Sequence, residues 1–185
     1  VLMIDVASGD SKPALDYAEQ CVKLNATVIS GNIVTESAAR RYRSIGVNIY
    51  RTGLGGGSAC STRRVAGVGI PQFTAIQDIY EWVKSVDDDQ LHILSDGGIR
   101  DSGDAVKALA AGASAIICGY LLAGADEAPG RRDGNVKEYN GMASQVALEA
   151  SGRVGHAVEG VSGWVKCTGP VRDTLDALGK GIRAG

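Results

Sequence analysis

The stretch LHILSDGGIRDSGDAVKALAAGASAIICGY, residues 91–120, contains the pattern that decides the fold. Its first part, LHILSDGG, is apolar and ends in an aspartate and two glycines, as is typical of a buried strand that leads into a tight loop. A helix is expected from Ser102 to Ala111, and the apolar segment SAIICGYLLAG follows as the next strand. Strands that alternate with helices favour a parallel sheet covered by helices.

The same strand–loop–helix unit recurs along the chain. Before residue 91 the expected strands are VLMID (1–5), ATVISGN (26–32) and VNIYRTG (47–53). The helices that follow them are expected from Pro13 to about Leu24, from Thr35 to Ser44 and over 74–86. Thr35 is a suitable N-cap for its helix. With the two strands described above, the chain has five such units, and each strand ends in polar or glycine residues.

These units predict an α/β fold, a (β/α)8 TIM barrel of which the chain contains the C-terminal five β/α units. In such a barrel the C-terminal ends of the strands carry the active site, and about 250 residues are typical. We therefore expect three further units before Val1, a single catalytic domain over residues 1–185, and a last barrel helix from Pro170 to Ile182. An open, flavodoxin-like sheet is a weaker alternative, because no single switch point is evident.

Residues 126–168 interrupt this rhythm. The segment is rich in glycine, arginine, glutamate and aspartate, and it shows no convincing long helix. A long irregular stretch inside a compact domain is usually functional or mobile. We expect a mobile, flap-like segment over about residues 126–168.

Composition narrows the possible partners. Charged residues make up 22% of the chain and the net charge is −2, which gives no reason to expect a nucleic acid or a membrane surface. No apolar run approaches the roughly eighteen residues of a membrane span, so a cytoplasmic protein is expected. The four cysteines are scattered, which argues against a zinc site or a disulfide framework. We expect Cys21, Cys118 and Cys167 to be small core residues.

Glycine loops in two adjacent units point to a phosphate site. Gly97 and Gly98 follow one strand, and Gly119 follows the next. Exposed backbone N–H groups at such turns can cradle a phosphate, although the glycines could also serve only the tight turns. In barrels the loops after the last two strands are the usual phosphate site. Asp96, at the end of its strand, suits a pair of ribose hydroxyls, with helix capping as the alternative role.

A cysteine stands alone in the glycine loop GLGGGSACSTR, residues 53–63. Cys60 follows the third strand and lies near Arg63 and Arg64 in the sequence. Cationic neighbours and free backbone N–H groups both favour the thiolate, which can attack an electrophilic carbon. From the pattern alone, a nucleophile and a solvent-exposed bystander remain equally open. His92 and His156 have no partner acid at a fixed spacing, so a histidine-centred triad is unsupported.

The motifs resemble those of the inosine monophosphate dehydrogenase and guanosine monophosphate reductase family over essentially all 185 residues. The family's cysteine loop, G-x-G-x-G-S-x-C-x-T-R, is similar to GLGGGSACSTR. Its phosphate segment, DGGI-x-x-x-GD-x-x-KA-x-x-x-GA, is similar to DGGIRDSGDAVKALAAGA. LLAGADEAPG and YNGMAS also resemble family motifs, and all four occur in the family's order.

The resemblance implies roles for individual residues. Cys60 matches the nucleophile that adds to purine C2, and Thr62 with Glu159 matches a proton-handling pair. The matched positions around the substrate are Ser58, Gly97, Gly98, Gly119, Tyr120 and Tyr139 at the phosphate, Asp96 at the ribose, and Gly141 and Met142 at the base. Asp5, Ala7 and Asn32 fall where the nicotinamide cofactor lies. The backbone carbonyls of Gly55, Gly57 and Cys60 match the monovalent cation site of the family's dehydrogenases, which would hold potassium.

The resemblance leaves two activities open, and both pass through a covalent Cys60 adduct. A GMP reductase converts GMP to IMP and ammonia with NADPH, whereas an IMP dehydrogenase oxidises IMP to XMP with NAD. The segment QVALEASGRVGHA is short and has no Arg-Tyr pair, since Val154 follows Arg153. With DVASGDS and GVGIPQ, this favours the reductase. An inactive nucleotide-binding module is a further alternative, because Tyr120 stands where glycine or serine is usual. Family members are homotetramers, so a homotetramer is expected.

Overall fold

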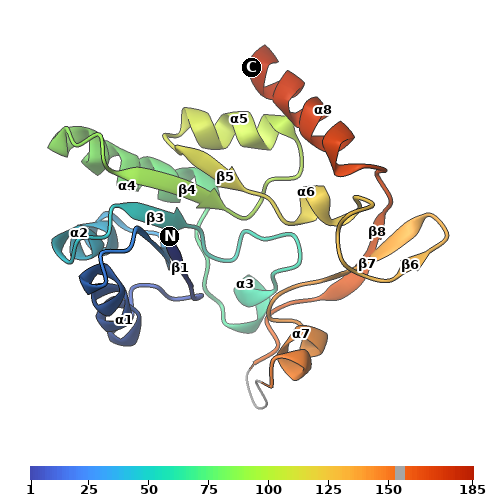
Figure 1. Ribbon diagram of the computed structural model, residues 1–185, viewed down its shortest axis with the longest axis horizontal. Helices are drawn as coiled ribbons and strands as arrows, with labels where there is room; N and C mark the ends of the chain where they lie inside the picture. Colours follow the sequence, from blue (N-terminus) through green and yellow to red (C-terminus); the bar gives the residue numbers. More distant parts are fainter. Residues whose placement is uncertain (153–156) are drawn as a thin grey trace. The chain divides into compact units, whose positions relative to one another are not determined.

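The computed structural model describes residues 1–152 and 157–185 (Figure 1). The chain forms two compact units. The first unit comprises residues 1–54, 70–96 and 107–117, and the second comprises residues 55–69, 97–106 and 118–185. Arg153, Val154 and His156, which entered the sequence predictions, lie outside the described residues.

A parallel five-stranded sheet forms the first unit. Its strands are β1 (Leu2–Asp5), β2 (Val28–Ile33), β3 (Ile49–Thr52), β4 (His92–Asp96) and β5 (Ala115–Ile117). Each strand pairs with the next one in the chain, so the order is β1-β2-β3-β4-β5. This order contains no reversal, and a reversal is what defines the switch point of a doubly wound sheet. The predicted α/β fold with five sequential barrel units is therefore confirmed.

Helices connect these strands near the predicted positions. They are α1 (Lys12–Lys23), α2 (Glu36–Ser44), α4 (Gln72–Val86) and α5 (Ser102–Ala110). Within α2, the buried residues Ala38, Ala39 and Tyr42 recur at helical spacing, and the hydroxyl of Tyr42 donates to the Gly9 carbonyl at 2.7 Å. Apolar side chains on the strands fill the opposite side of this core, including the fully buried Ile33.

The second unit contains an antiparallel sheet that the sequence analysis did not predict. Its strands are β6 (Arg132–Asp133), β7 (Val136–Asn140) and β8 (Ser162–Lys166), in that order. Its helices are α3 (Thr62–Val65), α6 (Tyr120–Ala123), α7 (Gln145–Ala150) and α8 (Val171–Ala184). The expectation of irregular structure over residues 126–168 is therefore wrong. The strands are short, β6 and β8 are largely exposed, and the buried position of β7 is a lysine, so they lack the apolar alternation that marks a half-buried strand.

Two smaller predictions meet different outcomes. The last helix was expected over residues 170–182 and is α8, whose first N–H, from Val171, donates to the carboxylate of Glu127 at 2.8 Å. Of the three cysteines expected in the core, only Cys21 is buried, while Cys118 and Cys167 are half-buried. Among the described residues, no helix is both long enough and apolar enough to cross a membrane.

The N-cap of α2 gives a direct test of the local folding argument. The side chain of Thr35 accepts the N–H of Ala38 at 3.2 Å, whereas Ser11, at the N-cap of α1, makes no such side-chain bond. Replacing Thr35 by Ala should lower the free energy of unfolding by about 1 kcal/mol, since a capping acceptor is lost. Urea titration measures this, with Thr35→Ser retaining most of the stability and Ser11→Ala as the matched control. Equal losses for Thr35→Ala and Ser11→Ala would contradict the capping role.

Candidate active site

A chain of two hydrogen bonds links Cys60 to a carboxylate in the second unit. The thiol of Cys60 donates to Oγ1 of Thr62 at 3.1 Å, and the Thr62 hydroxyl donates to Oε2 of Glu159 at 2.6 Å. Cys60 is exposed, Thr62 is buried and Glu159 is half-buried. The thiol is therefore accessible to a substrate, while the hydroxyl that connects it to the carboxylate is shielded from water.

Backbone pairing brings Glu159 to the cysteine loop across 97 residues of sequence. The N–H of Ser61 donates to the carbonyl of Glu159 at 2.7 Å, and the N–H of Val161 donates to the carbonyl of Ala59 at 2.9 Å. Cys60 and Gly160 thereby form an antiparallel bridge. Because main-chain bonds on both sides fix this register, the Glu159 side chain is held beside Thr62.

The same segment is attached to the turn that follows β7. The N–H groups of Glu159 and Gly160 both donate to the carbonyl of Ala143, at 3.1 and 3.0 Å. Gly141 returns a bond to the carbonyl of Val161 at 3.0 Å. Of the two residues matched to the purine base, Gly141 is thus buried beside the cysteine loop, and Met142 is 83% exposed.

The loop of Gly97 and Gly98, one of the two predicted phosphate loops, lies against the cysteine loop in the second unit. Gly97 and Gly98 have φ angles of +92° and +84°, which side chains rarely adopt. A Cβ on Gly97 would lie 3.1 Å from the backbone nitrogen of Gly57, so this loop packs on the glycines of the cysteine loop. Ser58, also matched to the phosphate, is exposed next to them. Backbone N–H groups in such concave turns can bind an anion.

Gly119, Tyr120 and Tyr139 form another group in the second unit. A Cβ on Gly119 would lie 3.3 Å from the hydroxyl of Tyr139. The rings of Tyr120 and Tyr139 meet edge to face, with centroids 6.0 Å apart. Burial, with a smaller contribution from Tyr120, raises the pKa of Tyr139. The Tyr139 hydroxyl therefore keeps its proton at neutral pH and can donate a hydrogen bond to an anion.

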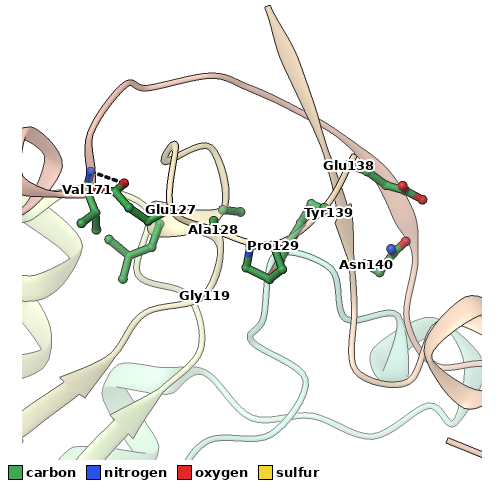
Figure 2. A pocket seen from close by; sticks show the side chains of 11 residues that line it. Gly119, Glu127, Ala128, Pro129, Glu138, Tyr139, Asn140 and Val171 are labelled. Atoms are coloured by element: carbon green, nitrogen blue, oxygen red, sulfur yellow. Dashed lines mark hydrogen bonds between the residues drawn. The ribbon is translucent and has the colours of Figure 1, made fainter. Parts of the chain in front are cut away.

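A cavity of about 490 Å³ adjoins Gly119 and Tyr139 (Figure 2). Its lining includes Leu122, Pro129 and Val171 as apolar residues, with Glu127 hydrogen-bonded to Val171 at one side. Because Gly119 and Tyr139 are also matched to the phosphate, the cavity lies next to that predicted subsite.

In the first unit, the strand ends carry a network of charged and amide groups. Nδ2 of Asn32 donates to Oδ2 of Asp96 at 2.7 Å and to the carbonyl of Gly53 at 2.8 Å. Arg51 forms ion pairs with Asp5 and with Asp96, the latter at 3.0 Å. The structure thus brings Asp5, Asn32 and Asp96 together, while Ala7 is exposed.

Sequence reasoning missed Arg51, which joins the predicted cofactor and ribose positions. Its side chain is 13% exposed, although it projects from the apolar strand segment VNIYRTG. The available signal was this arginine inside an otherwise apolar strand, since a buried charge is normally paired.

The network has features that fit a nicotinamide cofactor. Among the described residues, Oδ1 of Asn32 and Nε of Arg51 are buried without a hydrogen-bond partner. Buried polar groups are usually satisfied, so an acceptor and a donor of this kind suit a polar ligand. A carboxamide offers both a donor and an acceptor. The residues present therefore fit such a group.

The predicted cation site rests on backbone oxygens. The carbonyl of Gly57 accepts the N–H of Cys60 at 3.0 Å and keeps its second lone pair for a cation. Gly55, Gly57 and Cys60 lie in one short loop, so their carbonyls fit part of a coordination shell but supply only three ligands. Within the described ranges, no cluster of His, Cys, Asp and Glu could hold a metal ion.

The fold and this loop define an α/β barrel-type chain with an accessible cysteine coupled to a carboxylate. The sequence model of the "IMP dehydrogenase / GMP reductase domain" matches residues 1–185. The chain therefore belongs to the IMP dehydrogenase and GMP reductase family.

Its similarity to individual members is extensive. The chain is 39% identical to inosine-5'-monophosphate dehydrogenase of Halalkalibacterium halodurans and 41% identical to that of Thermoplasma acidophilum. Each alignment covers 100% of this chain and 40% of the relative, so the chain spans about 40% of the length of these relatives. A solved GMP reductase of Trypanosoma brucei, in complex with guanosine 5'-monophosphate, superposes with a TM-score of 0.91 at 35% identity. That match covers 99% of this chain and 40% of the other.

The Arg51 network should contribute to the stability of the sheet. Replacing Arg51 by Met leaves Asp96, which is 18% exposed, without its cationic partner. We expect the free energy of unfolding to fall by about 2 kcal/mol or more, because an uncompensated, partly buried charge is costly. Lys12→Met breaks the exposed Lys12–Asp16 pair and should change stability by less than about 0.5 kcal/mol. Chemical denaturation of both variants measures the contrast, and equal effects would contradict it.

Proposed function

We propose that this chain is the C-terminal part of the catalytic barrel of a GMP reductase, an enzyme that converts GMP to IMP and ammonia with NADPH. The observation that carries the proposal is the hydrogen-bonded series from Cys60 through Thr62 to Glu159. It supplies both a nucleophile and an acid–base group, and a reductive deamination needs both. The short segment QVALEASGRVGHA, which has no Arg-Tyr pair, supports the same assignment.

In the first half-reaction, the sulfur of Cys60 bonds to C2 of the purine. The thiol proton passes through Oγ1 of Thr62 to Glu159, in the direction in which both hydrogen bonds point. Glu159 then returns this proton to the 2-amino group, which leaves as ammonia when the C2–N bond breaks. A thioimidate on Cys60 remains, and general acid–base help of this kind typically contributes 10²- to about 10⁴-fold in rate.

In the second half-reaction, C2 changes from a thioimidate carbon to the C–H of IMP. The nicotinamide cofactor, when bound, supplies the hydride for this carbon. The C2–S bond then breaks. Because Glu159 gave its proton to the ammonia, a proton from solvent reaches the Cys60 thiolate through Glu159 and Thr62. Asp5, Ala7 and Asn32 are the residues that we assign to the cofactor, and Arg51 joins them because it pairs with Asp5.

The remaining substrate contacts follow from the same assignment. The phosphate would bind Ser58, the loop of Gly97 and Gly98, and the group of Gly119, Tyr120 and Tyr139. Asp96 would accept from the ribose hydroxyls, and Gly141 with Met142 would contact the base. We also propose a potassium ion at the carbonyls of Gly55, Gly57 and Cys60, a flap function for residues 126–168, and a homotetramer.

IMP dehydrogenase is the second candidate, and the names of the curated relatives favour it. The Cys60 adduct at C2 is common to both reactions. In the dehydrogenase, hydride leaves C2 of IMP for NAD, and water then hydrolyses the thioimidate to XMP. The assignments of Cys60 and of the phosphate residues stay the same, whereas a water-activating group is needed in addition.

An assay of the full-length protein separates the two reactions. With GMP and NADPH, we expect the nicotinamide absorbance to fall and ammonia to appear in equal amount. With IMP and NAD, we expect no NADH. NADH formation from IMP without any reaction of GMP would replace the reductase by the dehydrogenase. Nucleotide binding without turnover in both assays would identify an inactive nucleotide-binding module.

The proton path predicts the effects of two conservative variants. Thr62→Val and Glu159→Gln should each lower kcat with GMP by about 10²-fold or more, because the thiol proton loses its route to the carboxylate. Cys60→Ala should abolish turnover, since no adduct can form. Steady-state kinetics measure these effects.

The matched control is Glu149→Gln in α7, an exposed glutamate whose partner is Gln145. This variant should keep the wild-type kcat. A Glu159→Gln variant as active as Glu149→Gln would exclude Glu159 from the proton path.

A further inference from the structure

Lys137 on β7 is a buried lysine whose ammonium group is fully used. Lys137 is 4% exposed. Nζ donates to the carbonyls of Ala125, Asp126 and Ala128 at 2.6, 3.0 and 2.5 Å. An ammonium group carries three protons, so each one has a carbonyl acceptor. Burying a charge is expensive unless it is hydrogen-bonded, and these three bonds meet that requirement.

The three carbonyls belong to one turn, residues 125–128, which follows directly on α6. The N–H of Ala125 donates to the carbonyl of Leu122, so the turn continues the end of that helix. The N–H of Asp126 donates to the carbonyl of Gly169 at 2.8 Å. Glu127, in the same turn, lines the cavity beside Tyr139 (Figure 2). Lys137 is thus the side chain that joins this turn to strand β7.

The two ends of this connection carry residues of the proposed phosphate subsite. Lys137 and Tyr139 are two residues apart on β7, and side chains at that spacing share one face of a strand. Gly119 and Tyr120 lie at the start of α6, and the turn follows the end of the same helix. The hydroxyl of Tyr139 beside Gly119 and the edge-to-face contact of Tyr120 with Tyr139 both depend on how α6 is placed against β7.

We propose that Lys137 is a positioning residue for the phosphate subsite: its three hydrogen bonds set the distance between α6 and β7, and with it the place of the Tyr139 hydroxyl beside Gly119. The proposal rests on the proposed nucleotide activity. It adds a residue that touches no substrate but determines how tightly the phosphate is held. A nucleotide has the phosphate and its nucleoside does not, so Lys137 should change the affinity for GMP and leave the affinity for guanosine unchanged.

The test compares GMP with guanosine in the full-length protein by titration calorimetry, together with KM and kcat for GMP. Lys137→Met keeps the length of the side chain but cannot donate. We expect the Kd and KM for GMP to rise about tenfold, with guanosine affinity and kcat unchanged within about threefold. Lys166→Met, on the exposed face of the neighbouring β8, is the control and should leave all four quantities at wild-type values. Equal weakening of GMP and guanosine, or none, would overturn the proposal.

A second pair of variants tests whether Lys137 acts through Tyr139. Tyr139→Phe should weaken GMP without affecting guanosine, and adding Lys137→Met to it should weaken GMP by less than about twofold more. If the fold-losses in GMP affinity of the two single variants multiplied in the double variant, the link to Tyr139 would be overturned. Where Lys137→Met does not fold, Lys137→Arg carries the same comparison, because it keeps the charge but changes the donor geometry. Its GMP affinity should fall and its guanosine affinity should not.

The outcomes separate this inference from the function on which it rests. A wild-type protein that binds neither GMP nor IMP removes the proposed function and the role of Lys137 together. A wild-type protein that binds GMP, with Lys137→Met binding it equally well, removes only the role of Lys137.

Discussion

The short antiparallel contact between the cysteine loop and the segment around Glu159 is the constraint on which the candidate site depends. Main-chain bonds from Ser61 to Glu159 and from Val161 to Ala59 fix the register of the two segments. Only in that register do Cys60, Thr62 and Glu159 form a continuous series of hydrogen bonds. A shift by one residue would direct the Glu159 side chain to the other face, because side chains alternate along an extended segment.

The two residues of the cysteine loop that take part in this series differ in burial. Thr62 is buried and Cys60 is exposed. In the mechanism that we propose, Thr62 relays the proton and Cys60 reaches the substrate carbon. Preorganised donors and acceptors need no rearrangement when charge develops, and this is the main way in which a protein site lowers a barrier. We propose the same principle for Lys137, whose hydrogen bonds to the turn of residues 125–128 would hold Gly119 and Tyr139 in place before a phosphate binds.

The parts that the sequence could predict are those with local patterns. Each parallel strand is an apolar run followed by a glycine turn and a periodic helix, so the five-stranded sheet and the Thr35 cap were predictable. The sheet β6-β7-β8 was not predictable, because its strands are short, carry no apolar alternation, and include β8, which pairs with β7 across a long intervening segment. The burial of Arg51 and Lys137 could not be predicted for a related reason. A lone basic residue looks the same in a sequence whether it is solvated or buried against acceptors. Glu159 came from the family resemblance alone, since its partner Thr62 lies 97 residues away.

The central claim is that Cys60 bonds to purine C2 and that the amino group leaves with a proton relayed through Thr62 and Glu159. Acid quenching of the full-length protein with GMP in the absence of NADPH, followed by peptide mass mapping, tests it directly. The account predicts a nucleotide adduct on the Cys60 peptide, formed with release of one ammonia per adduct and strongly reduced in Glu159→Gln. An unmodified Cys60 peptide with GMP, together with an adduct that forms only from IMP and NAD, would contradict it.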